Sequence, residues 1–456
     1  MPKRDKVFSK LKEIVEEAYA IQDPDRLKSS ALDGKKPKMI VSPKTIEEVA
    51  KIVSYANEQN LTIVPMGNGT KMGMGRIPKK IDIILSTCRL NRFTDSDTDN
   101  LTLSVESGIT LNEVQKGLAK DGRGYFLPLD PPFTEKATIG GIVATNSSGP
   151  KRLLYGTARD LITGIKSVFP NGDIVVSGGK TVKNVSGYDM CKLLIGSFGT
   201  LGVICEITFK LLPLPEKETT LWIPFGTVGD ANGFVQEIAH SQLIPASMDI
   251  LNAVAVKNLN DKVSMPQNGN YLVAIGLEGV TESVERQISE MAERGKKYGA
   301  LETIPVDSEK HRTFWNAIRD YGQGFAGGYS NPISLKSNFL ISKGEEMLRS
   351  YEQIVRGWGV DCPMICHCGS GILYTYVPVG KNLRLKTESF VKLIEDLTSE
   401  AAKNGGNLVV ESCPLAIKKR IDVWGKPRSD YRIMRHLKEQ VDPAGVLNPG
   451  RFVGGI

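Results

Sequence analysis

The sequence lacks the features that mark membrane-spanning and secreted proteins. No apolar run reaches the ~18–20 residues that a membrane-spanning helix needs. The N-terminal segment MPKRDKVFSKLKEIVEE has neither the apolar core nor the small-residue cleavage site of a signal peptide. The 7 cysteines, an odd number in 456 residues, do not indicate a disulfide framework. We therefore expect a cytoplasmic protein with reduced thiols, and attachment to the inner face of the membrane through a partner stays open.

A large excess of charge of one sign is also missing. The 58 Lys+Arg and 51 Asp+Glu residues give a net charge of +7, and the basic residues lie in mixed-sign stretches such as Lys3–Lys12. A nucleic-acid partner is therefore not indicated. With 41% hydrophobic and 24% charged residues, the chain can bury sizeable cores, which excludes a disordered protein. Its length corresponds to about three domains of ~150 residues each.

Glycine, in contrast, is abundant and clustered. There are 46 glycines in 456 residues, about 10% against an average near ~7%. Closely spaced glycines let backbone N–H groups converge on an anion. The first cluster matches neither the nucleoside-triphosphate loop nor a G-x-G-x-x-G followed by a helix. Together the clusters predict a shell around an extended, phosphate-bearing cofactor; they lie at Pro65–Thr70, Thr138–Gly149, Tyr155–Asp160, and Lys183–Asp189 continued by Gly196–Ile204.

Two blocks of different pattern follow a helix predicted over Ser9–Ala20. In the first, from Pro37 to about Pro215, a helix over Thr45–Glu58 is followed by strand-like runs, which predicts α/β structure. In the second, strand-like runs alternate with stretches of helical length, which predicts a sheet with an antiparallel pairing and helices on one face. The runs of this second block are Leu221–Pro224, Tyr271–Leu277 and Ile333–Ile341, and a last helix is expected over Ser429–Gln440.

As an ordered set, these motifs resemble the FAD-linked oxidases of the vanillyl-alcohol oxidase/p-cresol methylhydroxylase (PCMH) type. This family includes D-lactate dehydrogenases and subunits of glycolate oxidase. The resemblance implies an α+β fold, with a two-subdomain PCMH-type FAD-binding domain and an α+β cap domain that contains an antiparallel sheet. It also implies a division into an N-terminal helical segment (1–36), the FAD-binding domain (37–216), the cap or substrate domain (217–404) and a C-terminal segment (405–456) that returns to the FAD-binding domain.

The resemblance also implies how FAD is held. Members that link the flavin covalently often have a histidine in the first glycine loop, where this sequence has Asn68, so non-covalent FAD is expected. The implied FAD contacts are Pro65, Gly67, Asn68, Gly69, Thr70, Pro131, Thr138, Gly140, Gly141, Ala144, Thr145, Asn146, Ser148, Gly149, Thr157, Asp160, Gly199, Thr200, Gly202, Val203, Ile204 and Asn448.

The catalytic motifs depart from those of the family. Catalytic members carry H-x-G-x-G-x-x-H and a later E-H-G triplet, which supply metal ligands and the base that removes the hydroxyl proton. Here the first motif begins at His367 but ends at Tyr374, and the triplet begins at Glu411 but has Ser412 in place of its histidine. One histidine and one carboxylate make a poor site for a divalent metal, so no metal site is expected.

Within the family, the chain therefore most resembles the second, accessory FAD-binding component of glycolate oxidase rather than its catalytic flavin component. This resemblance implies a catalytic flavin paralogue and an iron–sulfur protein as partners, with this chain relaying electrons between them. The alternative is that the chain is itself an active FAD-dependent dehydrogenase of a small 2-hydroxy acid, of the glycolate or D-lactate type. The missing histidines favour the relay.

Some residues of a substrate site persist. Trp315–Arg319 resembles the family's W-x-x-x-R, whose arginine forks onto a substrate carboxylate, and Lys336 lies where relatives place a second cation. The alternatives are a helix-surface salt bridge for Arg319 and a solvent-facing Lys336. The candidate catalytic set is thus Arg319, Lys336, Glu411, His367 and Tyr374, although Glu411 and Tyr374 are also explained as relict positions beside the flavin.

Four cysteines near these motifs have two explanations. Cys362, Cys366, Cys368 and Cys413 lack the C-x2-C spacing of most zinc and iron–sulfur loops. On a strand, Cys366 and Cys368 share one face while His367 points to the other. Packing in a buried strand is favoured over metal binding.

Overall fold

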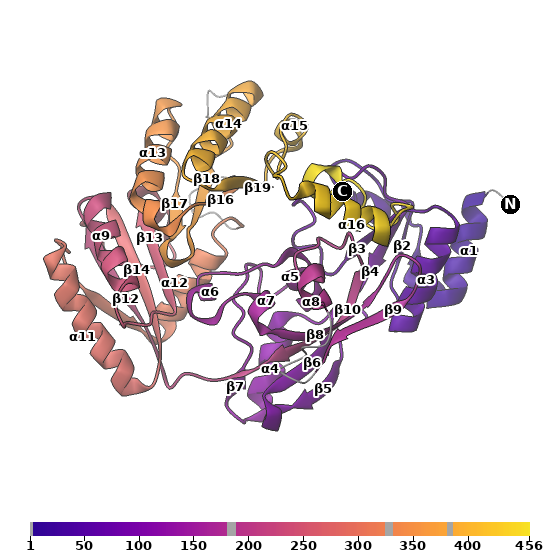
Figure 1. Ribbon diagram of the computed structural model, residues 1–456, viewed down its shortest axis with the longest axis horizontal. Coiled ribbons are helices and arrows are strands. Elements are labelled where there is room, and N and C mark those ends of the chain that lie inside the picture. The colour runs from indigo at the N-terminus through magenta and orange to yellow at the C-terminus, as the bar shows by residue number, and fades with distance from the viewer. Residues whose placement is uncertain (1–2, 180–187, 324–331, 381–385) are drawn as a thin grey trace. The chain divides into compact units, whose positions relative to one another are not determined.

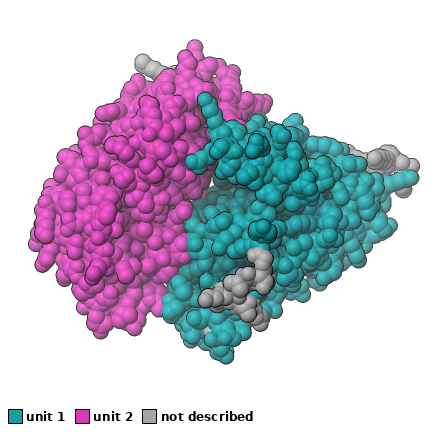
Figure 2. All heavy atoms as spheres, viewed as in Figure 1, with its two compact units in different colours: residues 1–148, 157–213, 426–456 teal, residues 149–156, 214–425 magenta. Residues whose placement is uncertain are grey.

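The protein, seen here as a computed structural model, is described over residues 3–179, 188–323, 332–380 and 386–456. It divides into two compact units (Figure 2). Unit 1 comprises residues 1–148, 157–213 and 426–456, and unit 2 comprises residues 149–156 and 214–425. Residues 426–456 thus return to the unit that contains the glycine clusters, whereas residues 405–425 belong to unit 2.

One half of unit 1 is built on a four-stranded sheet in the order β1-β2-β4-β3. β2, β4 and β3 run parallel, and β1 is antiparallel to β2. Thr45 caps α3, because its Oγ1 accepts a hydrogen bond from the Glu48 N–H at 3.2 Å. The elements are β1 (Ala20–Ile21), β2 (Met39–Val41), β3 (Ile63–Met66) and β4 (Ile83–Ser86), with α1 (Lys3–Val15), α2 (Pro24–Ser29) and α3 (Ile46–Glu58).

The first helix differs from the prediction of Ser9–Ala20. α1 ends at Val15, because the next residue, Glu16, has a positive φ of 69° that no α-helix accommodates. Ala20 then pairs with Val41 at the edge of the sheet. The α1 residues Val7, Leu11 and Val15 are buried in the same hydrophobic core as the apolar residues of α3. This helix is therefore part of the fold of unit 1.

The other half of unit 1 is a five-stranded antiparallel sheet in the order β5-β6-β10-β8-β9. Helices pack on it through a core that includes Leu111, Ile142 and Leu194. The strands are β5 (Phe93–Asp97), β6 (Thr102–Glu106), β8 (Ile162–Val168), β9 (Ile174–Gly178) and β10 (Val203–Lys210). The helices are α4 (Leu111–Asp121), α5 (Ile139–Thr145), α7 (Ala158–Leu161) and α8 (Met190–Leu194), and β7 (Tyr125–Phe126) pairs with β11 (Leu212–Pro213).

The C-terminal tail of the chain is tied to β3 of the first sheet. After α16 (Tyr431–Val441), Leu447 forms a parallel bridge with Ile63. The Ile63 N–H donates to the Val446 carbonyl at 2.7 Å, and the Asn448 N–H donates to the Ile63 carbonyl at 2.8 Å. The tail therefore lies beside the strand that leads into the first glycine loop (Figure 1).

Unit 2 is built on an eight-stranded antiparallel sheet in the order β15-β12-β14-β13-β17-β18-β16-β19. Alternate residues of these strands are buried on opposite faces, which explains their long apolar runs. The strands are β12 (Lys217–Phe225), β13 (Ser247–Asn252), β14 (Tyr271–Gly279), β15 (Ile304–Asp307), β16 (Ile333–Asn338), β17 (Met364–His367), β18 (Ile372–Val377) and β19 (Asn407–Ser412).

Helices cover both faces of this sheet, so the prediction of helices on one face only was wrong. Four helices pack through one core: α9 (Val228–Ala239), α11 (Thr281–Lys297), α13 (Gly344–Gly357) and α14 (Thr387–Lys403). On the opposite face, α10 (Ala253–Leu259) and α12 (Ser308–Arg319) form a second core with Trp222, Leu251 and Ile365. The short helices α6 (Arg152–Tyr155) and α15 (Leu415–Lys418) complete the unit. Among the described residues, no helix combines the length and apolar character needed to cross a bilayer.

Candidate functional site

The first two glycine clusters and the segment Gly196–Ile204 contribute to the lining of one pocket, which lies within unit 1, whereas Tyr155–Asp160 does not line it. The pocket is partly open to solvent, and the empty space between its walls, open solvent included, is about 850 Å³. Most of the predicted FAD contacts form its walls: Pro65, Gly67, Asn68, Gly69, Thr70, Thr138, Gly140, Gly141, Ala144, Thr145, Gly199, Gly202, Val203, Ile204 and Asn448.

Gly67 is needed where the first loop meets α5. A Cβ built on Gly67 would lie 2.1 Å from Thr138 Oγ1, a distance at which one of the two segments must move. Thr138 is itself fixed as the N-cap of α5, where its Oγ1 accepts from the Gly141 N–H at 3.3 Å. The neighbouring Asn68 side chain donates from Nδ2 to the Lys136 carbonyl at 2.9 Å. The loop and the helix thus form one continuous wall.

Polar groups of this wall fit an anionic, hydrogen-bonding cofactor. Asn448 is buried and donates from Nδ2 to the Phe198 carbonyl at 2.6 Å, while its Oδ1 meets no hydrogen-bond donor in the part of the chain that the structure describes. Lys71 carries its ammonium on the same wall and donates to Ser147 Oγ at 2.7 Å. The unmatched Asn448 Oδ1 suits the amide group of FAD as a hydrogen-bond acceptor. The Lys71 ammonium suits its pyrophosphate.

The sequence prediction missed several residues of the pocket. Outside the predicted clusters they are Lys71, Met72, Thr87, Pro132, Ala137 and Arg451, and inside the clusters Met66, Ile142, Ser147 and Phe198 line the pocket without having been named as contacts. For Lys71 the signal was a cation directly after Thr70 in the first glycine loop. Arg451 belongs to the Asn448–Arg451 turn, and its Nη2 donates to the carbonyls of Met72 and Met74 at 2.6 Å each, so it connects the tail to the first loop.

Other predicted contacts lie outside the lining of this pocket: Pro131, Asn146, Ser148, Gly149, Thr157, Asp160 and Thr200. Thr157 and Asp160 form a capping box at α7, and Thr200 Oγ1 donates to the Ser197 carbonyl at 2.6 Å. Local hydrogen bonds to the backbone therefore account for Thr157, Asp160 and Thr200. Residues 183–187 of the fourth glycine cluster fall outside the described part.

The candidate catalytic residues come from neighbouring strands of unit 2. Lys336 on β16 and Ile365 on β17 are both register partners of Tyr374 on β18. The rings of His367 and Tyr374 meet edge to face with centroids 5.4 Å apart, and the Lys336 ammonium lies 5.8 Å from the Tyr374 ring centroid. The structure therefore brings Lys336, His367 and Tyr374 together on the sheet face that also carries α10 and α12.

A carboxylate that the sequence analysis missed lies behind His367. Asp249 on β13 is the register partner of His367, and its Oδ1 lies 2.7 Å from His367 Nδ1. Burial raises the pKa of Asp249, while His367 opposes this shift. The signal in the sequence was a single carboxylate between Met248 and Ile250 in an otherwise buried strand.

Glu411, on β19, is part of the same electrostatic environment. Burial is the largest cause that raises the pKa of Tyr376, and the charge of Glu411 is the next. The Tyr376 ring stacks at 6.2 Å on the ring of Tyr374. The face of the sheet thus holds a run of aromatic rings bordered by Lys336, Glu411 and the Asp249–His367 pair.

Arg319 ends α12, which packs on this face. The helix is hydrogen-bonded to β12: the Trp315 indole N–H donates to Thr220 Oγ1 at 2.8 Å. Arg319 Nη2 donates to Asn316 Oδ1 at 2.9 Å and lies 3.7 Å from Asp320 Oδ2, so the helix-surface ion pair named as an alternative does form. Its buried Nε has no hydrogen-bond partner among the described residues, which leaves donor capacity for an oxygen ligand.

One group of side chains in the described part has the spacing of metal ligands: Glu218, Glu278 and His311. A cation is already provided there, because the Lys151 ammonium lies 2.5 Å from Glu278 and 3.2 Å from Glu218. Tyr155 also donates to Glu278 at 2.6 Å. The group is therefore explained as a salt-bridge network within unit 2.

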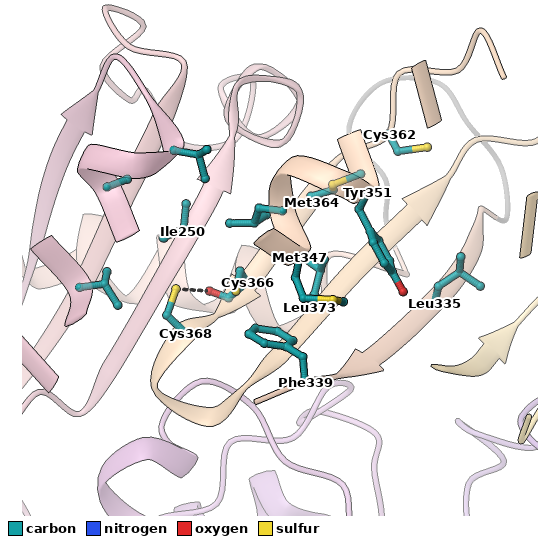
Figure 3. Packing of buried hydrophobic residues seen from close by; sticks show 14 of the residues in the cluster. Ile250, Leu335, Phe339, Met347, Tyr351, Cys362, Met364, Cys366, Cys368 and Leu373 are labelled. Atoms are coloured by element: carbon teal, nitrogen blue, oxygen red, sulfur yellow. Dashed lines mark hydrogen bonds between the residues drawn. The ribbon is translucent and has the colours of Figure 1, made fainter. Parts of the chain in front are cut away.

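The cysteines near the motifs lie in the packed core of unit 2 (Figure 3). Cys362, Cys366 and Cys368 are buried with Met364, Leu373 and Phe339. Cys368 Sγ donates to the Cys366 carbonyl at 3.2 Å, and burial raises the pKa of Cys368 well above its usual value. His367 points to the other face, toward Asp249, as the strand alternation predicted. Packing accounts for the three cysteines.

Comparisons with known proteins agree with this geometry. Residues 37–178 match the family described as FAD binding domain, and residues 214–452 match the family described as FAD linked oxidases, C-terminal domain. The chain therefore belongs to the FAD-linked oxidases, and FAD is its cofactor.

Individual relatives fall in the same group. The chain is 28% identical over 421 residues to the glycolate oxidase subunit GlcD of Bacillus subtilis, covering 91% of this chain and 89% of the relative. It is 29% identical over 422 residues to the D-lactate dehydrogenase of Archaeoglobus fulgidus, covering 91% of each. The structure of p-cresol methylhydroxylase superposes with a TM-score of 0.79 at 16% identity, over 99% of this chain and 97% of that one, which confirms the PCMH-type fold. The chain is an FAD-dependent oxidoreductase of the group that acts on CH–OH bonds.

Proposed function

We propose that this chain binds FAD non-covalently and itself oxidises a small 2-hydroxy acid of the glycolate or D-lactate type to the 2-oxo acid. The observation that carries the proposal is the gathering of Lys336, His367 and Tyr374 on one sheet face, with Glu411 at its border and Arg319 at the end of the helix that packs on it. FAD supplies the hydride acceptor when bound.

Each side chain then has a role that its chemistry allows. Arg319 presents a guanidinium with unused donor capacity, which suits a planar carboxylate. Lys336 adds a second cation near the substrate. The aromatic rings of Tyr374 and Tyr376 exclude water from the reacting carbon, and Pro65, Gly67, Asn68, Gly69, Thr70 and Asn448 would hold FAD in unit 1.

The likeness to a glycolate oxidase subunit supports a place in a complex. We propose that electrons leave this chain for an iron–sulfur protein and that a flavin paralogue is present in the same assembly. Purification of the native complex tests this: a cysteine-rich protein and a paralogue with both motif histidines should co-purify.

A second candidate is a relay component that receives its electrons from the catalytic paralogue. Tyr374 and Ser412, which replace two motif histidines, favour it. The lone FAD-loaded chain distinguishes the two candidates when it is assayed with glycolate, D-lactate and D-2-hydroxyglutarate and an artificial electron acceptor. Turnover supports the active dehydrogenase, and its absence with all three supports the relay.

A further inference from the structure

The buried carboxylate of Asp249 is a feature of unit 2 that packing does not explain. Its side chain is 0% exposed on β13, between the apolar residues Met248 and Ile250. Oδ1 is bonded to His367 Nδ1 at 2.7 Å, whereas Oδ2 has no hydrogen-bond partner within the described residues. A buried carboxylate with one oxygen unmatched is costly, and an apolar residue would suit the strand better.

The register of the sheet makes this pair rigid. Asp249 and His367 are directly opposite residues of adjacent antiparallel strands, and both side chains are almost fully buried. The ring of Tyr374 packs edge to face against the imidazole. The imidazole is therefore held by strand backbones and an aromatic ring, with little rotational freedom.

The hydrogen bond to Asp249 fixes where the imidazole carries its proton. A carboxylate accepts, so Nδ1 of His367 must donate, and the neutral ring then has a bare Nε2. No hydrogen-bond partner for Nε2 is found among the described residues. Lys336 and Glu411 lie near the pair on this face, with the phenols of Tyr374 and Tyr376 between them. Farther along the same face are Glu218, Glu278 and His311, and Arg319 ends the helix that covers it.

We propose that Asp249 is a positioning residue that holds His367 with Nε2 ready to accept the proton of the substrate hydroxyl. This inference rests on the proposed function and identifies its base: His367 takes the role that Ser412 cannot. In the reaction, the O–H bond breaks and its proton passes to His367 Nε2, the C2–H bond breaks, and the C–O bond becomes a carbonyl. Bound FAD would accept the hydride from C2, and with it the two electrons that the hydroxy acid loses.

Histidine nitrogen NMR of the full-length FAD-loaded protein tests the positioning without reference to activity. The chain has only 4 histidines, and two of them are buried with defined partners. His367 should carry its proton on Nδ1. His311 serves as the internal reference, because its Nδ1 lies 2.8 Å from the Thr220 hydroxyl and has no contact with Asp249. Asp249→Asn should move the His367 proton to Nε2, as the amide can donate to Nδ1, and should leave His311 unchanged.

Anaerobic reduction of the flavin by substrate provides the second readout. Asp249→Asn and His367→Gln should each slow reduction at saturating substrate by about 100-fold or more, with little change in the substrate concentration at half-saturation. Ser247→Ala, a buried substitution on the same strand and face, is the control and should change neither readout.

The outcomes separate this inference from the proposed function. An unchanged His367 tautomer in Asp249→Asn, or an unchanged reduction rate in either variant, would overturn the inference while the wild-type activity still stands. A wild-type protein whose flavin no hydroxy acid reduces would overturn the proposed function and the inference with it.

Discussion

Lys438 and Asp442 form a buried ion pair one helical turn apart, at the end of α16. The same ammonium donates to the carbonyls of Thr200 at 2.7 Å and Leu447 at 2.9 Å, and Asp442 accepts from the N–H groups of Val446 and Leu447. These bonds connect α16, the segment before β10 and the tail that carries Asn448. Lys438 therefore helps to hold the C-terminal part of the FAD pocket, together with the bridge between Leu447 and Ile63 and the hydrogen bonds of Arg451.

Lys438→Met should strongly destabilise unit 1. The substitution leaves the Asp442 carboxylate buried without its cation, which typically costs about 3–5 kcal/mol of unfolding free energy. FAD should also dissociate faster, because Leu447 and Asn448 lose their anchor. Urea unfolding followed by the release of flavin fluorescence measures both effects. Arg435→Met on the same helix removes a surface ion pair and should have little effect; equal losses in the two variants would contradict the role of Lys438.

Gly67→Ala should abolish tight FAD binding. Its Cβ would lie 2.1 Å from Thr138 Oγ1, so the first loop must move away from α5 and the wall of the pocket must open. We expect the FAD dissociation constant to rise by at least about tenfold, or ~1.4 kcal/mol, in calorimetric titration of the apoprotein. Gly73→Ala lies in the same glycine-rich segment, and its Cβ would meet nothing within 4 Å. If both variants bind FAD like the wild type, the assignment of this wall is wrong.

Arg319→Lys should weaken substrate binding more than it slows chemistry. Lysine keeps the charge but cannot present two parallel N–H donors to a carboxylate, so the substrate concentration at half-saturation should rise by about tenfold or more. Anaerobic flavin reduction over a range of D-lactate concentrations measures it. Arg312→Lys, at an exposed position of the same helix, serves as the matched control. A similar change in both variants would indicate a general effect of charge on α12.

His311 should make the stability of unit 2 depend on pH. Burial lowers its pKa from 6.5 to about 4, so between these values the unfolded chain binds a proton that the folded chain does not. Above pH 6.5, His311 therefore does not lower the free energy of unfolding. As the pH falls from 6.5 toward 4, its titration lowers that free energy. At about pH 4.5 the loss from this group should be ~2 kcal/mol.

His311→Gln removes this titration and should flatten the pH dependence by that amount. All 4 tryptophans, Trp222, Trp315, Trp358 and Trp424, lie in unit 2, so their fluorescence during urea unfolding reports on this unit. His436→Gln, at an exposed position, is the control. An unchanged slope in His311→Gln would contradict the assignment of the acid sensitivity to this histidine.

The cofactor half of this site was largely predictable because its chemistry depends on the backbone. The first glycine loop approaches α5 so closely that only glycine fits at position 67, beside Thr138. A constraint of this kind acts on single residues of a short motif, so it can be recognised in the sequence. The prediction assigned Thr157 and Asp160 to the cofactor as part of a glycine-containing cluster, whereas in the structure their side chains form a capping box at α7. The role of Lys71 depends on which way a long side chain points, which the sequence does not specify.

The catalytic half depends on strand register, which the sequence did not reveal. Asp249 and His367 are 118 residues apart, and only the pairing of β13 with β17 makes them neighbours. The position of α12 was missed for a similar reason. Its apolar residues Phe314, Trp315 and Ile318 predict a buried stripe, but they do not say which face of the sheet the stripe covers.

Rapid anaerobic mixing of the lone, FAD-loaded chain with D-lactate or glycolate tests the central claim most directly. The absorbance of the oxidised flavin is followed over a single turnover, so neither a partner protein nor an electron acceptor takes part. If this chain carries its own substrate site and base, the yellow colour should bleach in a substrate-dependent, saturable phase that Arg319→Lys shifts to higher substrate concentration. A flavin that stays oxidised with every hydroxy acid, and bleaches only when the catalytic paralogue is added, would contradict the claim.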